Sequence, residues 1–306
     1  MIRDRALFAG DVSIDLTLTC ARMPAPDEKV TVDTAVEAPG GVAANAAVAC
    51  ALAGTPSVLL VSTGDDGLGD RLVEQIRARG VEVFASVNTG STCRVVIILE
   101  PHGEKRLLLH PGVSMFPSAR QLAQVSLENV GWFHSAVYNI SDAKIMIERC
   151  RDHQIPWSFD LEPSTFPAGI DTLADLIDGA AVLFCNARAI ETIGKGAVAR
   201  LLSMGAASVV ETLGAVGVRL HTKDDFRDVA APAAARVKDT TGAGDCLAGW
   251  FISERLRGVG PEEALQTATA AATLSCQGLG AQSSYPTRAD VTDPTAWLTQ
   301  SSRPAL

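Results

Sequence analysis

Short apolar runs alternate with longer segments of helical periodicity along most of the chain. The short runs predict strands at residues 6–10, 57–61, 132–137, 157–160, 182–185 and 208–211. The periodic segments predict helices at residues 42–53, 68–79, 142–151, 171–177, 196–204, 242–257 and 261–277. Alternation of strands and helices is typical of a parallel sheet with right-handed crossovers, so we expect an α/β fold.

Other segments have strand character but lie outside this alternation. Residues 16–20 and 29–33 follow a period of two, and a hairpin is expected where residues 93–100 and 105–110 flank Pro101-His102-Gly103-Glu104. These segments predict a small β-sheet lid, inserted at about 16–36 and 92–110 into a single domain of residues 1–306. Two further short strands are expected at 216–221 and 226–229.

Composition narrows the class of protein. Of 306 residues, 47% are apolar and 20% charged, as in an ordinary globular protein. The net charge of -9 argues against nucleic acid or an anionic membrane as a partner. Seven cysteines without a CxxC pair indicate reduced thiols rather than zinc ligands, and no signal peptide or membrane-spanning run is evident. We therefore expect a cytoplasmic protein.

The segment from residue 237 to 251 carries the clearest chemistry. Gly242, Ala243 and Gly244 precede an apolar helical pattern, so their backbone amides face outward at a helix start and can bind an anion. Asp245 lies in the first turn of the same helix. A carboxylate would repel a bound anion unless it is there to accept a proton, which indicates a phosphoryl-transfer centre. The alternative interpretation is an acidic helix start after a glycine turn.

Four motifs together resemble those of the ribokinase-like (PfkB) carbohydrate kinases. Asp239-Thr240-Thr241-Gly242-Ala243-Gly244-Asp245 resembles the second signature of that family, and Gly40-Gly41-Val42-Ala43-Ala44-Asn45 resembles the first. Gly10-Asp11-Val12-Ser13-Ile14-Asp15 resembles the opening strand, and Thr212-Leu213-Gly214-Ala215-Val216-Gly217 the nucleotide loop. They occur in the family's order and at its separations. The resemblance implies a three-layer sandwich with a mostly parallel central sheet, plus the β-sheet lid.

The resemblance also implies catalytic roles. Asp245 would accept a proton from a substrate hydroxyl that attacks the γ-phosphate of ATP. The amides of Gly242, Ala243 and Gly244 would stabilise the transferring phosphoryl group, and Mg²⁺ would bridge the phosphates. Because Asp245 lies in the first turn of a helix, we expect it to be ionised at neutral pH.

Binding roles follow in the same way. Sugar contacts would come from Asp15, Gly40, Gly41 and Asn45, with Ser13 as a weaker candidate. Nucleotide contacts would come from Asn186, Thr212, Gly214 and Gly217. The structural alternatives are a strand end for Asp15, a strained turn for Gly40 and Gly41, a helix-start residue for Asn45 and a turn between strands for the nucleotide loop.

The segment from residue 275 to 284 resembles the one that closes over the adenine. In potassium-activated relatives this segment also binds a monovalent cation. The matching oxygens here would come from Asp239, Thr241, Ser275, Gly278, Gly280 and Ser284. A shell of hard oxygen ligands suits K⁺, whereas the alternative interpretation is a helix end and a surface loop.

Two positions depart from the family pattern. Ala189 replaces the glutamate of an Asn-x-x-Glu element that begins at Asn186. Asp160 and Glu162 either compensate for that loss or are solvated loop acids. Val42 occupies a position where ribokinase carries a lysine, which weakens the case for ribose as the substrate.

We therefore expect an ATP-dependent kinase acting on the hydroxymethyl group of a small sugar such as a ketohexose or pentose. A nucleoside or polyol kinase of the same fold, or a catalytically silent binding regulator, remains as an alternative. Exposed lid strands favour a homodimer joined through the lid. Arg94, Lys105 and Arg106 either contact the substrate or only keep the lid soluble, and we prefer the second interpretation.

Overall fold

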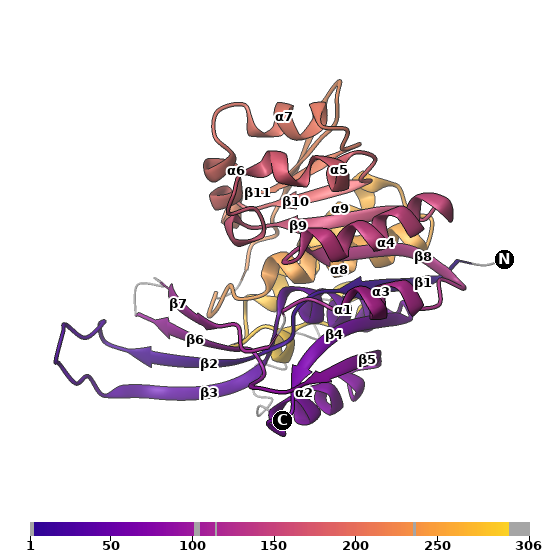
Figure 1. Ribbon diagram of the computed structural model, residues 1–306. Coiled ribbons are helices and arrows are strands. Elements are labelled where there is room, and N and C mark those ends of the chain that lie inside the picture. Colours follow the sequence, from indigo (N-terminus) through magenta and orange to yellow (C-terminus); the bar gives the residue numbers. More distant parts are fainter. Residues whose placement is uncertain (1–2, 101–104, 114, 235–236, 294–306) are drawn as a thin grey trace.

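A nine-stranded sheet forms the centre of the structure, a computed structural model that describes residues 3–100, 105–113, 115–234 and 237–293. Its strand order is β13-β12-β11-β10-β9-β8-β1-β4-β5 (Figure 1). Neighbours from β5 to β11 pair in parallel, and β12 and β13 are antiparallel additions at one edge. The strands are β1 (Arg5–Ala9), β4 (Ser57–Gly64), β5 (Val81–Asn88), β8 (Val130–Ala136), β9 (Trp157–Leu161), β10 (Val182–Cys185), β11 (Val209–Thr212), β12 (Gly217–His221) and β13 (Phe226–Ala230).

Helices cover both faces of this sheet. One apolar cluster joins it to α1 (Val42–Leu52), α2 (Leu68–Arg77), α8 (Ala243–Leu256) and α9 (Pro261–Ser275). The other joins it to α3 (Ala119–Gln124), α4 (Ile140–Asp152), α5 (Ala174–Ile177), α6 (Ala187–Ile193) and α7 (Ala197–Ser203). In β1, Ala6 and Phe8 face the first cluster, whereas Leu7 and Ala9 face the second. The predicted three-layer α/β sandwich is confirmed.

A second sheet of four strands extends from the large sheet (Figure 1). Its order is β3 (Val32–Gly40), β2 (Ser13–Cys20), β6 (Arg94–Leu99) and β7 (Lys105–His110). This is the predicted lid, but the prediction of a strand at residues 29–33 was wrong. The strand that pairs with β2 runs instead from Val32 to Gly40 and leads directly into α1. The predicted turn at residues 101–104 lies outside the described residues.

Four strands or helices were not predicted, namely β5, α3, α6 and α10 (Arg288–Thr292). β5 alternates buried and exposed residues at its start, where Val81 and Val83 pack inward. α3 begins at Ser118, which forms a capping box with Gln121. α6 begins at Asn186, whose side chain caps the helix. The helix expected at residues 171–177 is a 3-10 turn, Ile170–Leu173, followed by the short α5. In the described part of the chain, no helix has the length and apolarity needed to cross a membrane.

Candidate active site

The predicted site residues gather at the carboxyl ends of the parallel strands, where α/β sheets bind their ligands. Asp11 follows β1, Asp160 lies near the end of β9, and Asn186 follows β10. The first turns of α1 and α8 bring Asn45 and Asp245 to the same place. Residues more than 200 positions apart in the sequence therefore form one site.

Asp245 is half-buried, and several other acids act on its pKa. Burial raises the pKa of its carboxyl well above the ordinary value, and the neighbouring carboxylates of Asp160, Glu162 and Asp11 raise this pKa further. The hydrogen bond from Asn45 lowers the same pKa. The expectation that Asp245 is ionised at neutral pH considered only the helix start. Desolvation and like charges act on the pKa in the opposite direction, and the ionisation of Asp245 at neutral pH stays a prediction.

Asn45 holds the Asp245 carboxylate. Its side-chain amide donates to Asp245 Oδ2 at 2.8 Å, and its own Oδ1 accepts from Gln282 Nε2 at 3.0 Å. The orientation of Asn45 is thus fixed on both sides. Gln282 lies in the segment expected to close over adenine, but its contact with Asn45 was not predicted. A contact across 237 residues leaves no signal in local sequence spacing.

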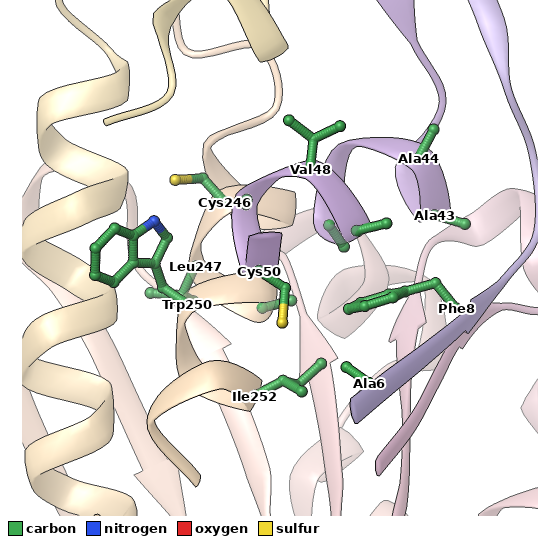
Figure 2. Packing of buried hydrophobic residues seen from close by; sticks show 14 of the residues in the cluster. Ala6, Phe8, Ala43, Ala44, Val48, Cys50, Cys246, Leu247, Trp250 and Ile252 are labelled. Atoms are coloured by element: carbon green, nitrogen blue, oxygen red, sulfur yellow. The ribbon is translucent and has the colours of Figure 1, made fainter. Parts of the chain in front are cut away.

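Close packing of two helices sets this geometry. α1 is rich in buried alanines, and α8 packs against it in the cluster drawn in Figure 2. A Cβ atom at Gly249 of α8 would lie 2.3 Å from the carbonyl oxygen of Ala46. The backbones therefore approach closely because a glycine faces alanines, and this approach puts Asn45 within hydrogen-bond distance of Asp245.

The predicted sugar loop is held by a buried carboxylate. Asp11 accepts from the amides of Val42 and Ala43, at 3.1 and 3.2 Å, at the start of α1. Burial raises the pKa of Asp11 to about 6, against the effect of those two bonds. Gly41 has a φ of 103°, and a Cβ atom there would lie 2.7 Å from the carbonyl oxygen of Asp11. Only glycine fits this turn.

Asp15 and Ser13 lie side by side on β2, opposite Gly40 of β3. Ser13 Oγ donates to Asp15 Oδ1 at 2.7 Å, and a Cβ atom at Gly40 would lie 2.2 Å from Asp15 Oδ2. Burial raises the pKa of Asp15 to about 6, and the charge of Asp239 contributes in the same direction. The structure therefore brings Ser13 and Gly40 together around the Asp15 carboxylate, whereas Gly41 packs against Asp11 and Asn45 bonds to Asp245.

The start of α8 is open on one side. Gly242 adopts a φ of 73°, and its carbonyl accepts from Tyr285 Oη at 2.7 Å. A Cβ atom at Gly242 would lie 2.5 Å from the Ala281 side chain. At Gly244, by contrast, no atom of the described residues lies within 4 Å of the Cβ position. Free space therefore adjoins the predicted amide cradle of Gly242, Ala243 and Gly244.

The two segments predicted to hold a monovalent cation are in contact. Asp239 accepts from the amide of Gly280 at 3.0 Å and from the amide and hydroxyl of Thr241 at 2.9 and 2.7 Å. Ser284 Oγ donates to the carbonyl of Gly280 at 2.6 Å. A Cβ atom at Gly278 would lie 2.4 Å from Ser284 Cβ, and Ser275 is buried. The alternative of a helix end and a surface loop holds in part, since α9 ends at Ser275, although Gly280 and Ser284 are buried; cation binding stays a prediction.

Two of the residues predicted to bind the nucleotide also stabilise local structure. Asn186 Oδ1 accepts from the amide of Ala189 at 2.9 Å, so this side chain caps α6. A Cβ atom at Gly217 would lie 2.1 Å from the Val229 carbonyl, so pairing with β13 requires glycine there. Thr212 ends β11, and Gly214 has a φ of 59° with no described atom within 4 Å of its Cβ position. Gly214 thus leaves open space beside the loop.

Comparison with known proteins places the whole chain in one family. The sequence profile described as "pfkB family carbohydrate kinase" matches residues 3–288. The chain belongs to the pfkB family of carbohydrate kinases. It is 27% identical to the ATP-dependent ribose-1-phosphate kinase of Halopiger xanaduensis, over 91% of this chain and 94% of that protein. It is also 27% identical to the ribokinase of Bacillus subtilis, over 92% of this chain and 96% of that protein.

Solved structures agree with this fold. The Arabidopsis thaliana ribokinase complexed with ribose and ATP is 26% identical, with a TM-score of 0.76 over 99% of this chain and 100% of that one. A ribokinase structure from Giardia lamblia has a TM-score of 0.81 at 19% identity, covering 97% of this chain and 99% of that one. The predicted carbohydrate kinase family and its fold are confirmed.

Ala189 occupies the position at which the resemblance implies a glutamate. The side chain of Ala189 is fully buried in an apolar cluster, and Glu191 nearby is exposed. The charge of Asp160, near the end of β9, raises the pKa of the Asp245 carboxyl. Burial raises the pKa values of both Asp160 and Glu162. Asp160 is buried and Glu162 is half-buried, so neither is a fully solvated loop residue.

Such an acidic site suits a metal that arrives with its ligand. In the described residues, no group of three or more His, Cys, Asp or Glu side chains is arranged to hold a metal ion. Hard carboxylate oxygens close to Asp245 nevertheless match the preference of Mg²⁺, which is commonly held by one or two carboxylates together with substrate phosphates. The residues present therefore fit a metal carried in on a nucleotide.

Proposed function

We propose that this pfkB kinase transfers the γ-phosphoryl group of ATP to the hydroxymethyl group of a small sugar. The observation that carries the proposal is Asp245, held by Asn45 at 2.8 Å in the first turn of α8, beside the open space at Gly244. This arrangement combines a proton acceptor with outward-facing amides at a helix start. Ribokinases and a ribose-1-phosphate kinase among the relatives support this class of reaction.

Asp245 would take the proton of the sugar hydroxyl as that oxygen bonds to the γ-phosphorus. The bond from the γ-phosphorus to the bridging oxygen breaks, and ADP leaves with that oxygen. The amides of Gly242, Ala243 and Gly244 would stabilise the charge on the transferring group. Mg²⁺, held by the phosphates with Asp160 and Glu162, would supply further positive charge. Thr212, Gly214 and Gly217 remain the predicted nucleotide loop, with Asn186 beside it.

Sugar recognition would centre on Asp15. Its carboxylate can accept from two sugar hydroxyls, and Ser13 orients it from the same strand. Gly40 leaves room for the Asp15 carboxylate and Gly41 for the backbone of Asp11 and Val12, so this loop packs closely beside the proposed sugar-binding carboxylate. Val42 provides no cation at the position next to Gly41. A neutral hydroxylated acceptor therefore fits this loop better than an acceptor with a phosphate at that end.

An acceptor panel tests the proposed function. Purified protein with ATP and Mg²⁺ is assayed for ADP release with pentoses, ketohexoses, ribose 1-phosphate, 2-dehydro-3-deoxygluconate and nucleosides. We expect sugar-dependent ADP release and a phosphosugar detectable by mass spectrometry. Preferential turnover of nucleosides would favour the nucleoside-kinase alternative. Sugar binding without ATP turnover for any acceptor would favour a silent binding regulator.

Two further expectations belong to this proposal. The loops of Asp239–Thr241 and 275–284 are proposed to bind K⁺, and equal rates in KCl and in a large organic cation chloride would reject that role. The exposed leucines of β7, Leu107, Leu108 and Leu109, support a homodimer through the lid. Light scattering after size-exclusion chromatography checks this: Leu108→Lys should shift a dimeric wild type toward the monomer.

A further inference from the structure

One lid residue reaches across to the start of α8. Lys105 is the first residue of β7, and its ammonium donates to Thr240 Oγ1 at 3.0 Å and to Thr241 Oγ1 at 3.2 Å. Asp239 Oδ1 lies 3.8 Å from the same nitrogen. These contacts join the four-stranded sheet to the turn that immediately precedes Gly242. The interpretation of Lys105 as a charge that only keeps the lid soluble is therefore corrected.

The contact is part of a continuous polar network. Thr241 Oγ1 accepts from Lys105 and donates to Asp239 Oδ1 at 2.7 Å. The other oxygen of Asp239 accepts from the amide of Gly280. Lid, turn and the 275–284 segment are thus tied through one carboxylate whose side chain is 1% exposed. A cation at one end of such a network strengthens its hydrogen bonds.

The turn held by Lys105 is the one that leads into the cradle. The carbonyl of Thr240 accepts from the amide of Ala243 at 3.3 Å. A shift of Thr240 would therefore move the cradle amides, whose alignment determines how well they stabilise the transferring group. Lys105 is also a positive charge in a region crowded with acids, since Asp239 is close enough to raise the pKa of Asp15.

We propose that Lys105 is a positioning residue, a cation of the lid that fastens the lid to Thr240, Thr241 and Asp239 and fixes the cradle for transfer. This inference rests on the proposed function, because its catalytic consequence requires phosphoryl transfer at α8. Sugar bound between Asp15 on the lid and Asp245 on the body would be enclosed only while this contact is made.

The test compares substitutions at two adjacent lid cations. Lys105→Met removes the ammonium and keeps an unbranched side chain of similar shape, Lys105→Arg keeps the charge, and Arg106→Met is the matched control. Arg106 pairs with Glu100 of the lid itself. With the best acceptor at saturating KCl, we expect Lys105→Met to lower kcat by about tenfold or more. The KM for ATP should change less, and Lys105→Arg and Arg106→Met should stay close to wild type.

Rescue by an added amine separates an electrostatic role from simple loss of packing. Methylammonium should restore part of the kcat of Lys105→Ala and leave wild type and Arg106→Met unchanged. Wild-type kinetics for Lys105→Met would overturn the proposal. The proposal would also be overturned if added methylammonium did not restore the kcat of Lys105→Ala and the variant Lys105→Arg were no more active than Lys105→Met.

Hydrogen–deuterium exchange tests the same contact without turnover. In Lys105→Met, amides of residues 105–110 and 237–245 should exchange faster than in wild type, with Arg106→Met unchanged. Identical exchange in all three proteins would overturn the proposed fastening. If the proposed function is wrong, the wild-type protein will be inactive with every acceptor. The exchange experiment does not need turnover, so it would still decide whether Lys105 fastens the lid.

Discussion

The side-chain amide of Asn45, on α1, donates a 2.8 Å hydrogen bond to the carboxylate of Asp245, on α8. This bond opposes the effects that raise the pKa of Asp245, namely burial and the charges of Asp160, Glu162 and Asp11. Gln282 fixes the other end of the Asn45 amide. A residue expected to contact sugar thus also sets the orientation and basicity of the proposed base.

Replacing Asn45 with alanine should affect both rate and pH dependence. We expect kcat to fall about tenfold to a hundredfold because the carboxylate loses its orientation. Loss of the donor also raises the pKa of Asp245, so the acid limb of the kcat/KM profile should move to higher pH. Initial rates between pH 5 and 9 measure both effects. A lower rate with an unmoved acid limb would contradict the bond's role in setting basicity.

Replacing Asp160 with asparagine should move the acid limb in the opposite direction. The Asp160 charge raises the pKa of Asp245, so its removal lets Asp245 lose its proton at lower pH. The limb is measured at saturating Mg²⁺, with the exposed Glu191→Gln as control. A limb that shifts equally in both variants, or in neither, would argue against coupling between these carboxylates.

The Asp15 carboxylate should lower the free energy of unfolding although it serves to bind the sugar. Its pKa is about 6 in the folded protein against an ordinary 3.8, so the folded state holds its proton more tightly than the unfolded chain. Stability therefore falls as pH rises between these values, and the loss persists at neutral pH. Asp15→Asn should raise the free energy of unfolding at pH 7.5 by about 1–2 kcal/mol, measured by urea denaturation.

The same variant should lose sugar phosphorylation by about a hundredfold, because its amide cannot replace the carboxylate as a double acceptor. Asp33→Asn, an exposed aspartate of β3, is the control and should change neither quantity. An Asp15→Asn protein that is fully active, or less stable than wild type at pH 7.5, would refute this account of Asp15.

Two glycines of the cradle should respond differently to alanine. At Gly242, the φ of 73° and the close Ala281 side chain predict a loss of about 1–3 kcal/mol in stability. At Gly244, the described residues leave space for a methyl group, so Gly244→Ala should not lower the thermal unfolding temperature. That methyl would occupy space proposed for phosphate, and kcat/KM for ATP should fall about tenfold or more. Full activity of Gly244→Ala would place the nucleotide elsewhere.

The periodicity of the sequence predicted the large sheet well because its strands are buried on both faces. It missed β5, which lies at the edge of that sheet and alternates Val81 and Val83 with exposed residues. It missed α6 because Asn186 was interpreted only as a ligand, although it also caps that helix. The capping box at Ser118 and Gln121 is a local signal for α3 that could have been found.

Site residues within one motif could be predicted from local spacing, whereas contacts between motifs could not. The Asn45–Asp245 bond depends on how closely α1 approaches α8 at Gly249, which is a property of packing. The pKa of Asp245 depends on Asp160 and Glu162, which reach it from β9 and the turn after it. Lys105 and Thr240, which bond to each other, are 135 residues apart in the sequence, so the local pattern around neither residue predicts their contact.

The central claim is that Asp245 is the base of phosphoryl transfer, and Asp245→Asn tests it most directly. ADP release is measured with the best acceptor from the panel, and ATP binding is measured by calorimetry on the same preparation. The account predicts that kcat falls about a thousandfold or more while the affinity for ATP stays within a few fold of wild type. Wild-type turnover by Asp245→Asn would contradict the account.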